Sequence, residues 1–118
     1  MHRKDIERYE ELNSKLISLK GDIALLSAKK PNENVNEFKL KVINKVLAQI
    51  NDLIKEFKPE NDFEAFDLDV LPTNSDVLMM LNLYLNGMRR FKDANSVEDS
   101  KMDDWNTKFT SKVWDIED

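Results

Sequence analysis

The acidic residues near the C-terminal end form the densest group of potential metal ligands in the chain. Glu98, Asp99, Asp103 and Asp104 lie in one short segment, and on a helix Asp99 and Asp103 would share a face. Such carboxylates could attract a divalent cation, but the alternating acidic spacing and the glycine of an EF-hand loop are missing. We interpret the cluster as the solvated start of a helix and predict no metal site.

Catalytic groups are sparse in this sequence. His2 is the only histidine, and it lies in a terminus, which is usually frayed, so no Ser-His-Asp arrangement or Glu-x-x-His pair of a di-iron bundle is expected. There is no cysteine, which excludes cysteine nucleophiles. Gly21 and Gly87 are the only glycines, too few for a loop whose backbone amides cradle a phosphate. We predict that the protein is not an enzyme and binds no cofactor.

Aromatic residues supply the first candidate contacts with a partner. Phe63 and Phe66 are interleaved with acidic residues in segment 60–73, which is either a packed crossover or an acidic-aromatic docking segment. Trp114 lies off the apolar stripe of the last expected helix, and tryptophan is enriched among interface anchors. We predict that Phe63, Phe66 and Trp114 bind a partner.

Arg89 and Arg90, with Lys92 beside them, form the best basic cluster. Three charges are a small footprint for a phosphate backbone, particularly on an acidic protein, so nucleic-acid binding is disfavoured. The cluster also suits the negative end of a helix dipole. We retain Arg89 and Arg90 as candidate contacts with a protein partner.

Charge is divided unevenly along the chain, whose formal net charge is −5. Residues 1–58 carry 12 Lys/Arg and 9 Asp/Glu (+3), whereas residues 59–118 carry 6 and 14 (−8). The acidic half can fold onto the basic half, or copies can stack head to tail. The acidic half could also imitate nucleic acid.

Two apolar seams position most of these residues. Each has the 3-4-3-4 spacing of an amphipathic helix, and together they predict helices from about Asp5 to Lys29 and from the Asn34–Glu37 capping box to about Lys58. The first seam consists of Tyr9, Leu12, Leu16, Leu19, Ile23 and Leu26, and the core residues expected from the second helix are Val35, Phe38, Val42, Ile43, Val46, Leu47, Ile50, Leu53, Ile54 and Phe57.

Two shorter helices are expected in the second half. Asn74 or Ser75 can cap a nearly all-apolar helix that ends near Lys92, and Gly87 within it marks a close approach or an early fray. A last helix should start after Ser96 or Ser100, because each serine is followed three residues later by an aspartate, Asp99 or Asp103, that can act in a cap. An apolar stripe lines one face of this expected helix. That stripe contains Met102, Trp105, Phe109, Val113 and Ile116.

The fold class predicted is all-α. We expect one domain, residues 1–118, built as a four-helix bundle in which a long antiparallel hairpin is joined by two shorter helices. No stretch has the roughly 18 consecutive apolar residues of a membrane-spanning helix, so no membrane association is expected. The absence of cysteine fits a reducing compartment, and we expect the protein in the cytoplasm.

In size and composition the chain resembles small helical immunity, antitoxin-like and phage-encoded regulatory proteins, although no individual residue carries that resemblance. The function expected is a non-enzymatic protein-interaction module that binds another protein or itself, the latter through the third helix or the first seam. Two alternatives stay open, namely a bundle that holds a small apolar ligand near Tyr84 and the methionines, and an acidic nucleic-acid mimic.

Overall fold

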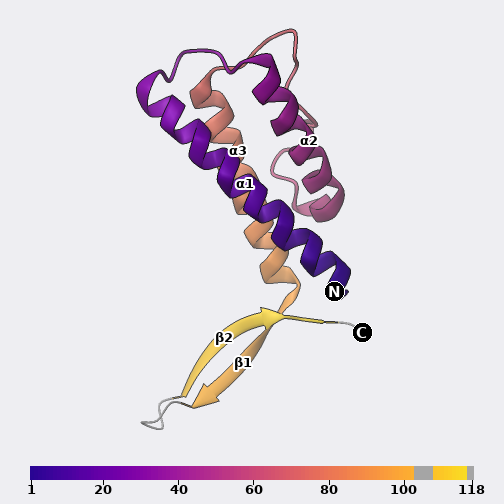
Figure 1. Cartoon of the computed structure of the whole chain (residues 1–118). Helices are drawn as coiled ribbons and strands as arrows, with labels where there is room; N and C mark the ends of the chain where they lie inside the picture. The colour runs from indigo at the N-terminus through magenta and orange to yellow at the C-terminus, as the bar shows by residue number, and fades with distance from the viewer. Residues whose placement is uncertain (103–107, 117–118) are drawn as a thin grey trace.

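The protein consists of helices followed by a β-hairpin that extends from one end (Figure 1). This is a computed structural model that describes residues 1–102 and 108–116, and only the backbone of residues 98–102 and 108–112. The molecule is elongated, measuring 56 × 31 × 21 Å. Its elements are α1 (Arg3–Lys29), α2 (Glu37–Ile54), the 3-10 turn η1 (Lys55–Phe57), α3 (Asn74–Ala94), β1 (Ser96–Met102) and β2 (Lys108–Trp114).

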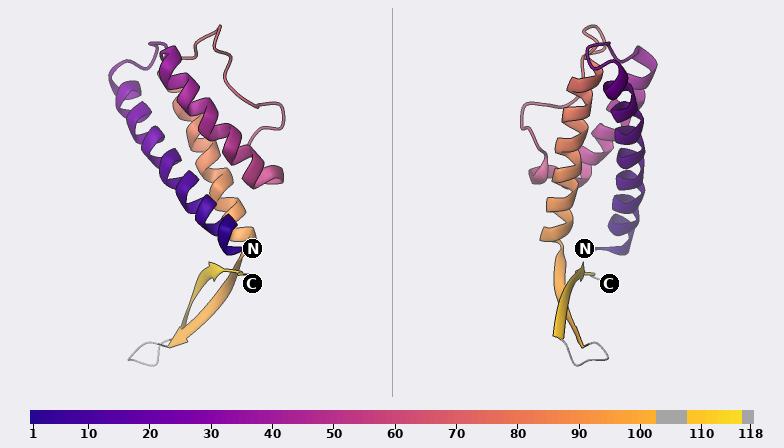
Figure 2. Two further views of the ribbon diagram at one scale, coloured as in Figure 1. Left: turned by 45° about the vertical axis from the view of Figure 1, so that its right-hand side comes forward. Right: turned by 90° about the vertical axis from the view of Figure 1, so that its left-hand side faces the viewer.

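The helices pack as an antiparallel hairpin, α1 and α2, with α3 against both, as the sequence predicted (Figure 2). The crossover, residues 58–73, returns the chain to the far end, so that α2 and α3 run in the same direction. Polar contacts tie the start of α1 to the ends of both neighbours. Arg8 pairs with Asp52 at 3.1 Å, and the Tyr9 hydroxyl donates to the Met88 carbonyl oxygen.

The core combines one face from each helix. The first predicted seam is confirmed, since four of its residues are buried and Leu19 and Leu26 are partly buried. The buried apolar residues are Tyr9, Leu12, Leu16, Ile23, Val35, Leu40, Ile43, Val46, Leu47, Ile50, Leu53, Ile54, Val77, Leu81, Tyr84 and Met88.

The prediction for α2 was wrong at three positions. Leu40 is fully buried although it was not expected in the core, whereas Phe38 and Val42 are exposed. Leu40 shares a face with Ile43 and Leu47 at i+3 and i+7, and this face meets α3 and α1. Because α2 is apolar on more than one face, the sequence pattern alone did not distinguish the buried row from the exposed one.

Both helix caps also differ from expectation. Asn36, rather than Asn34, caps α2 by accepting from the backbone N–H of Lys39 at 2.8 Å. Thr73 caps α3 by accepting from the N–H of Asp76 at 3.2 Å. Asn74 is instead buried and donates to the carbonyl oxygen of Lys30 at 2.9 Å, so its amide joins two connections instead of capping a helix.

The fourth helix, and with it the four-helix bundle, is not confirmed, although the structure is mostly helical. In the described part of the C-terminal segment, β1 and β2 form an antiparallel pair in which Val97 lies opposite Val113 and Ser96 opposite Trp114. Residues 109–114 are rich in aromatic and β-branched types, which favour strands. The helical stripe in this segment was therefore a coincidence of spacing, and Trp105, which belongs to that stripe, lies outside the described residues.

In the part of the chain that the structure describes, no helix combines the length and the apolar character needed to cross a membrane.

Candidate functional site

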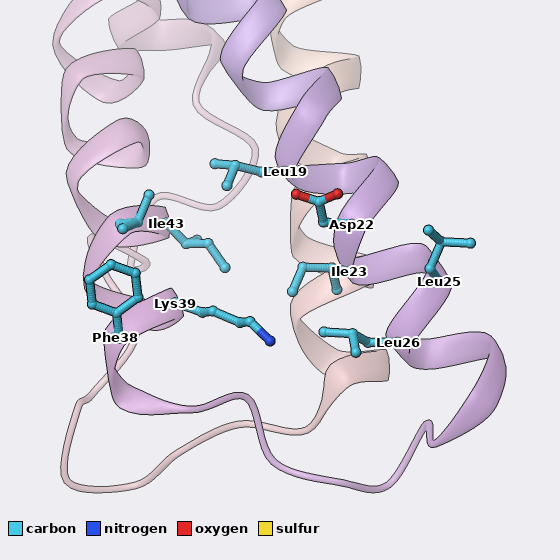
Figure 3. A pocket seen from close by; sticks show the side chains of 9 residues that line it. Leu19, Asp22, Ile23, Leu25, Leu26, Phe38, Lys39 and Ile43 are labelled. Carbon is cyan, nitrogen blue, oxygen red and sulfur yellow. The ribbon is translucent and has the colours of Figure 1, made fainter.

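An apolar groove opens between the C-terminal half of α1 and the N-terminal half of α2 (Figure 3). We call it the α1–α2 groove. It has a volume of about 390 Å³, and the segment that connects the two helices closes one end of it. Its lining residues are Leu19, Asp22, Ile23, Leu25, Leu26, Phe38, Lys39, Val42 and Ile43.

Large apolar side chains around the groove are exposed to solvent. Phe38 is 76% exposed, Leu25 67% and Val42 40%. Single exposed apolar residues are common on protein surfaces. Several of them around one hollow form an exposed apolar patch, and such patches often mark binding surfaces. The groove is therefore the strongest candidate binding site among the described residues.

A second hollow, of about 500 Å³, continues the groove toward the middle of both helices. It shares Leu19 and Val42 with the α1–α2 groove and adds Lys15, Ser18, Lys45, Val46 and Gln49. The two hollows together run along α1 from Lys15 to Leu26 and along α2 from Phe38 to Gln49. At 1.5 Å per residue, each wall is about 16 Å long, or three helical turns.

Hydrogen bonds hold the closed end of the groove in place. The connection between α1 and α2 is joined to the start of α3 by four of them. Val35 N–H donates to the Pro72 carbonyl oxygen, Asn74 N–H to that of Glu33, Ser75 N–H to that of Pro31, and the Asn74 amide to that of Lys30, at 2.8 to 3.1 Å. Phe38 follows this connection by only a few residues, so the groove is largely preformed.

Phe63 and Phe66, two of the predicted partner-binding residues, lie together in the crossover. Their ring centroids are 5.0 Å apart, and Phe63 also contacts the buried Tyr84 ring at 6.2 Å. The Asn44 side chain binds the backbone of Phe66 twice, accepting from its N–H and donating to its carbonyl oxygen, each at 2.9 Å. These contacts favour the packed-crossover interpretation of segment 60–73.

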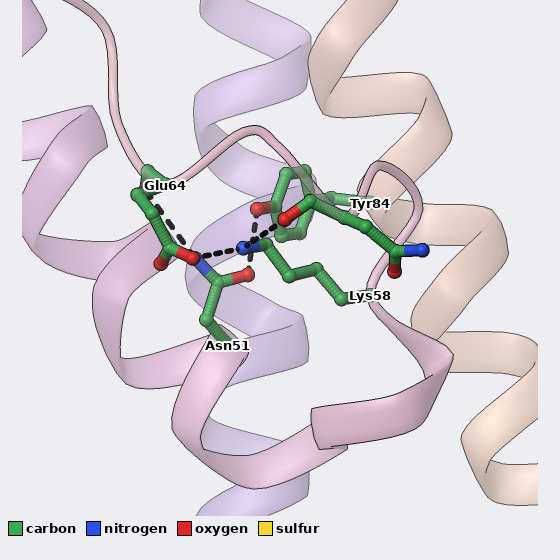
Figure 4. Close-up of polar contacts among 5 residues, drawn as sticks. Asn51, Lys58, Glu64 and Tyr84 are labelled. Atoms are coloured by element: carbon green, nitrogen blue, oxygen red, sulfur yellow. Dashed lines mark hydrogen bonds and ion pairs between the residues drawn. The ribbon is translucent and has the colours of Figure 1, made fainter.

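A polar cluster fastens the other end of the crossover (Figure 4). The Tyr84 hydroxyl donates to Asn51 Oδ1 at 2.6 Å, and the Asn51 amide donates to the Glu64 carbonyl oxygen at 3.3 Å. The Lys58 ammonium group pairs with the Glu64 carboxylate. Burial raises the pKa of Tyr84, and the nearby Glu64 charge acts in the same direction. No buried side-chain nitrogen or oxygen atom among the described residues lacks a hydrogen-bond partner, so the buried groups of this cluster are satisfied internally.

Trp114 lies at the base of the hairpin against α1. Its ring meets the Tyr9 ring edge to face with centroids 4.9 Å apart, its indole N–H donates to Glu10 Oε1 at 3.3 Å, and the Lys92 ammonium lies 5.2 Å from its ring centroid. The ring is partly buried. Trp114 thus attaches the hairpin to the helices. Its contact with a partner stays a prediction.

The two predicted arginine contacts are exposed near the end of α3. The Arg89 guanidinium donates to Asn86 Oδ1 at 2.6 Å, and that of Arg90 lies 5.8 Å from the Phe57 ring centroid. Neither lines the α1–α2 groove. The structure therefore brings Phe63 and Phe66 together. It does not bring Trp114, Arg89 and Arg90 into one site with these two rings.

No group of three or more His, Asp or Glu side chains is placed to hold a metal ion within the residues that the structure describes. The acidic cluster considered from the sequence, Glu98, Asp99, Asp103 and Asp104, falls outside the residues whose side chains are described.

Leu25, Phe38 and Val42 were not among the site residues predicted from the sequence. A signal was present, because Phe38 and Val42 form an i, i+4 pair beside the main α2 row, and Leu25 lies beside the α1 seam. An apolar face that is wider than the neighbouring helices can cover stays partly exposed.

Comparisons of the chain with protein-family models, curated proteins and solved structures found no match.

Proposed function

We propose that the protein is a non-enzymatic protein-interaction module that binds its partner in the α1–α2 groove. The observation that supports this most directly is the exposure of Leu25, Phe38 and Val42 around one preformed hollow. A role as a small regulatory, immunity or antitoxin-like protein is consistent with it, since such proteins act by occupying a partner. Of the two surfaces predicted for self-association, the seam on α1 is buried or partly buried within the chain.

Burial of the exposed residues supplies the driving force. Covering a large apolar side chain contributes about 1.5–3 kcal/mol, so Phe38 and Leu25 provide several kcal/mol before the entropic cost of association is subtracted. A groove about three helical turns long is smaller than a standard interface. We therefore propose a reversible complex in which Phe38 is the main anchor.

The test compares two exposed apolar residues in one capture experiment. Tagged protein is expressed in its native host as wild type, as Phe38→Asp and as Val70→Asp. Val70 is 70% exposed on the crossover and does not line the groove, so its substitution is a matched control. Proteins retained by wild type and by Val70→Asp but lost with Phe38→Asp are expected. An identical set of proteins with all three would contradict a role for the groove.

A small apolar ligand is the second candidate. The volume of about 390 Å³ is within the range of small-molecule pockets. The groove is open to solvent (Figure 3). This shape suits a row of side chains from a partner protein better than a small molecule that its pocket would enclose. Displacement of an apolar fluorescent dye by host lipid extract, with no captured protein, would favour the ligand.

A further inference from the structure

We propose that the occupant of the α1–α2 groove is an amphipathic α-helix of a partner protein, with acidic residues beside its apolar stripe. This inference rests on the proposed function and specifies the chemistry of the partner. It follows from the shape of the groove, from the charges along its walls and from the order of those charges.

The shape fits one helix. Two antiparallel helices with an apolar floor between them form the surface to which an amphipathic helix presents residues at i, i+3, i+4 and i+7. The length of about 16 Å accommodates about 11 residues of such a helix. The hydrogen bonds between the α1–α2 connection and the start of α3 keep this shape before binding, which lowers the cost of ordering.

The walls are mainly basic. Lys15, Lys39 and Lys45 line the two hollows, and Asp22 is the only acidic lining residue. Lys15 pairs with Glu11 at 3.2 Å, whereas Lys39 and Lys45 have no ion pair within the described residues. Figure 3 shows the Lys39 side chain extending between the two helices. These two ammonium groups on α2 select carboxylates on an incoming helix and disfavour lysine or arginine there.

A second copy of the chain fits less well. If two grooves met face to face around a twofold axis, each would present the same lysines to the other. In each copy the two hollows together are lined by three lysines and one aspartate, so the contact would bring like charges together. The charge pattern therefore favours a different, acidic helix as the occupant.

The experiment uses two synthetic peptides of about 14 residues with identical leucine stripes. One carries glutamate and the other lysine at the flanking positions, both are capped to stabilise the helix, and binding to the full chain is followed by fluorescence anisotropy. We expect the glutamate peptide to bind about tenfold more tightly at about 50 mM salt, with a smaller ratio at about 500 mM because salt screens exposed charges.

Variants assign the effect to named residues. Lys39→Glu with Lys45→Glu should weaken the glutamate peptide about tenfold and reverse the preference. Lys41→Glu is the matched control, because Lys41 lies on the same helix, pairs with Glu37 at 3.4 Å and does not line either hollow; a change within about twofold is expected. Phe38→Ser should weaken both peptides.

Several results would overturn the inference. Equal binding of both peptides, lost in Phe38→Ser, would leave the groove as a helix-binding site without charge selection; the proposed function would then survive. If neither peptide binds, the acidic helix is wrong, and a wild-type dimer that Phe38→Ser converts to a monomer would identify the second copy as the occupant. Binding unaffected by Phe38→Ser would place the contact elsewhere.

Discussion

The hydroxyl group of Tyr9 donates a 3.2 Å hydrogen bond to the backbone carbonyl oxygen of Met88, 79 residues later in the chain. The bond joins the start of α1 to the end of α3. Tyr9 is 3% exposed, and its ring stacks on that of Phe91 and meets the ring of Trp114 edge to face. One side chain thus connects the start of α1, the end of α3 and the base of the hairpin, which lie at the same end of the molecule (Figure 1).

The first prediction concerns alkaline pH. Burial raises the pKa of Tyr9 to about 12, with the charges of Glu10 and Asp93 acting in the same direction. In the unfolded chain tyrosine ionises near 10. Between these values the unfolded state binds fewer protons than the folded one, so the free energy of unfolding falls as pH rises. The Tyr9 contribution is fully present below about pH 9 and should fall by about 2 kcal/mol by pH 12.

Tyr9→Phe isolates this contribution from the other effects of alkaline pH, because it removes only the Tyr9 hydroxyl group. The variant should be less stable than wild type near pH 7, by about 1 kcal/mol for the lost hydrogen bond, but its stability should fall less steeply above pH 10. Urea unfolding at several pH values measures both quantities. Parallel curves for the two proteins would show that Tyr9 ionises normally in the folded state.

The second prediction compares alanine substitutions at the two glycines. A Cβ atom at Gly87 would lie 2.8 Å from the Phe57 carbonyl oxygen, whereas one at Gly21 would have nothing within 4 Å. Gly21→Ala should therefore stabilise the protein by about 0.5–1 kcal/mol through helix propensity. Gly87→Ala should destabilise it by at least about 1 kcal/mol, because η1 and α3 must separate. Thermal unfolding of both variants gives the two signs, and stabilisation by Gly87→Ala would mean that α3 does not approach η1 so closely.

The third prediction concerns Asn74, which is 3% exposed. Asn74→Leu removes the amide that donates to the Lys30 carbonyl oxygen and leaves that oxygen with the Glu33 N–H as its remaining donor, at a cost of about 1 kcal/mol. Asn32→Leu, at an exposed position in the same connection, should change stability by less than about 0.5 kcal/mol. Chemical unfolding of both variants tests the difference. Equal effects would show that the amide does not hold the connection to α3.

The fourth prediction tests whether the crossover is packed. Asn44→Ala removes both side-chain hydrogen bonds to the Phe66 backbone, and segment 60–70 should become more sensitive to protease while α1 stays protected. Asn86→Ala, which affects only an exposed contact with Arg89, is the control. Cleavage of wild type in this segment at the rate of Asn44→Ala would favour the alternative, in which the crossover is a free docking segment.

Residue patterns predicted the helical hairpin formed by α1 and α2 and the packing of α3 against it. The rows containing Leu16 and Ile50 repeat at helical spacing, and both residues are fully buried. The C-terminal segment was misjudged because Phe109 and Val113 satisfy a helical spacing while the residue types around them prefer a strand. Pairing of β1 with β2 joins residues that are 6 (Met102 and Lys108) to 18 (Ser96 and Trp114) positions apart, and a test of helical spacing along one segment does not detect such pairs.

The sequence by itself therefore determined that α1, α2 and α3 are helices, because a 3.6-residue period is a local property. Tertiary structure alone decided which apolar face of each helix was covered. Leu40 and Phe38 are similar in hydrophobicity and two positions apart, yet one is fully buried and the other is 76% exposed. Their difference depends on where α3 lies against α2, and this placement leaves the α1–α2 groove open.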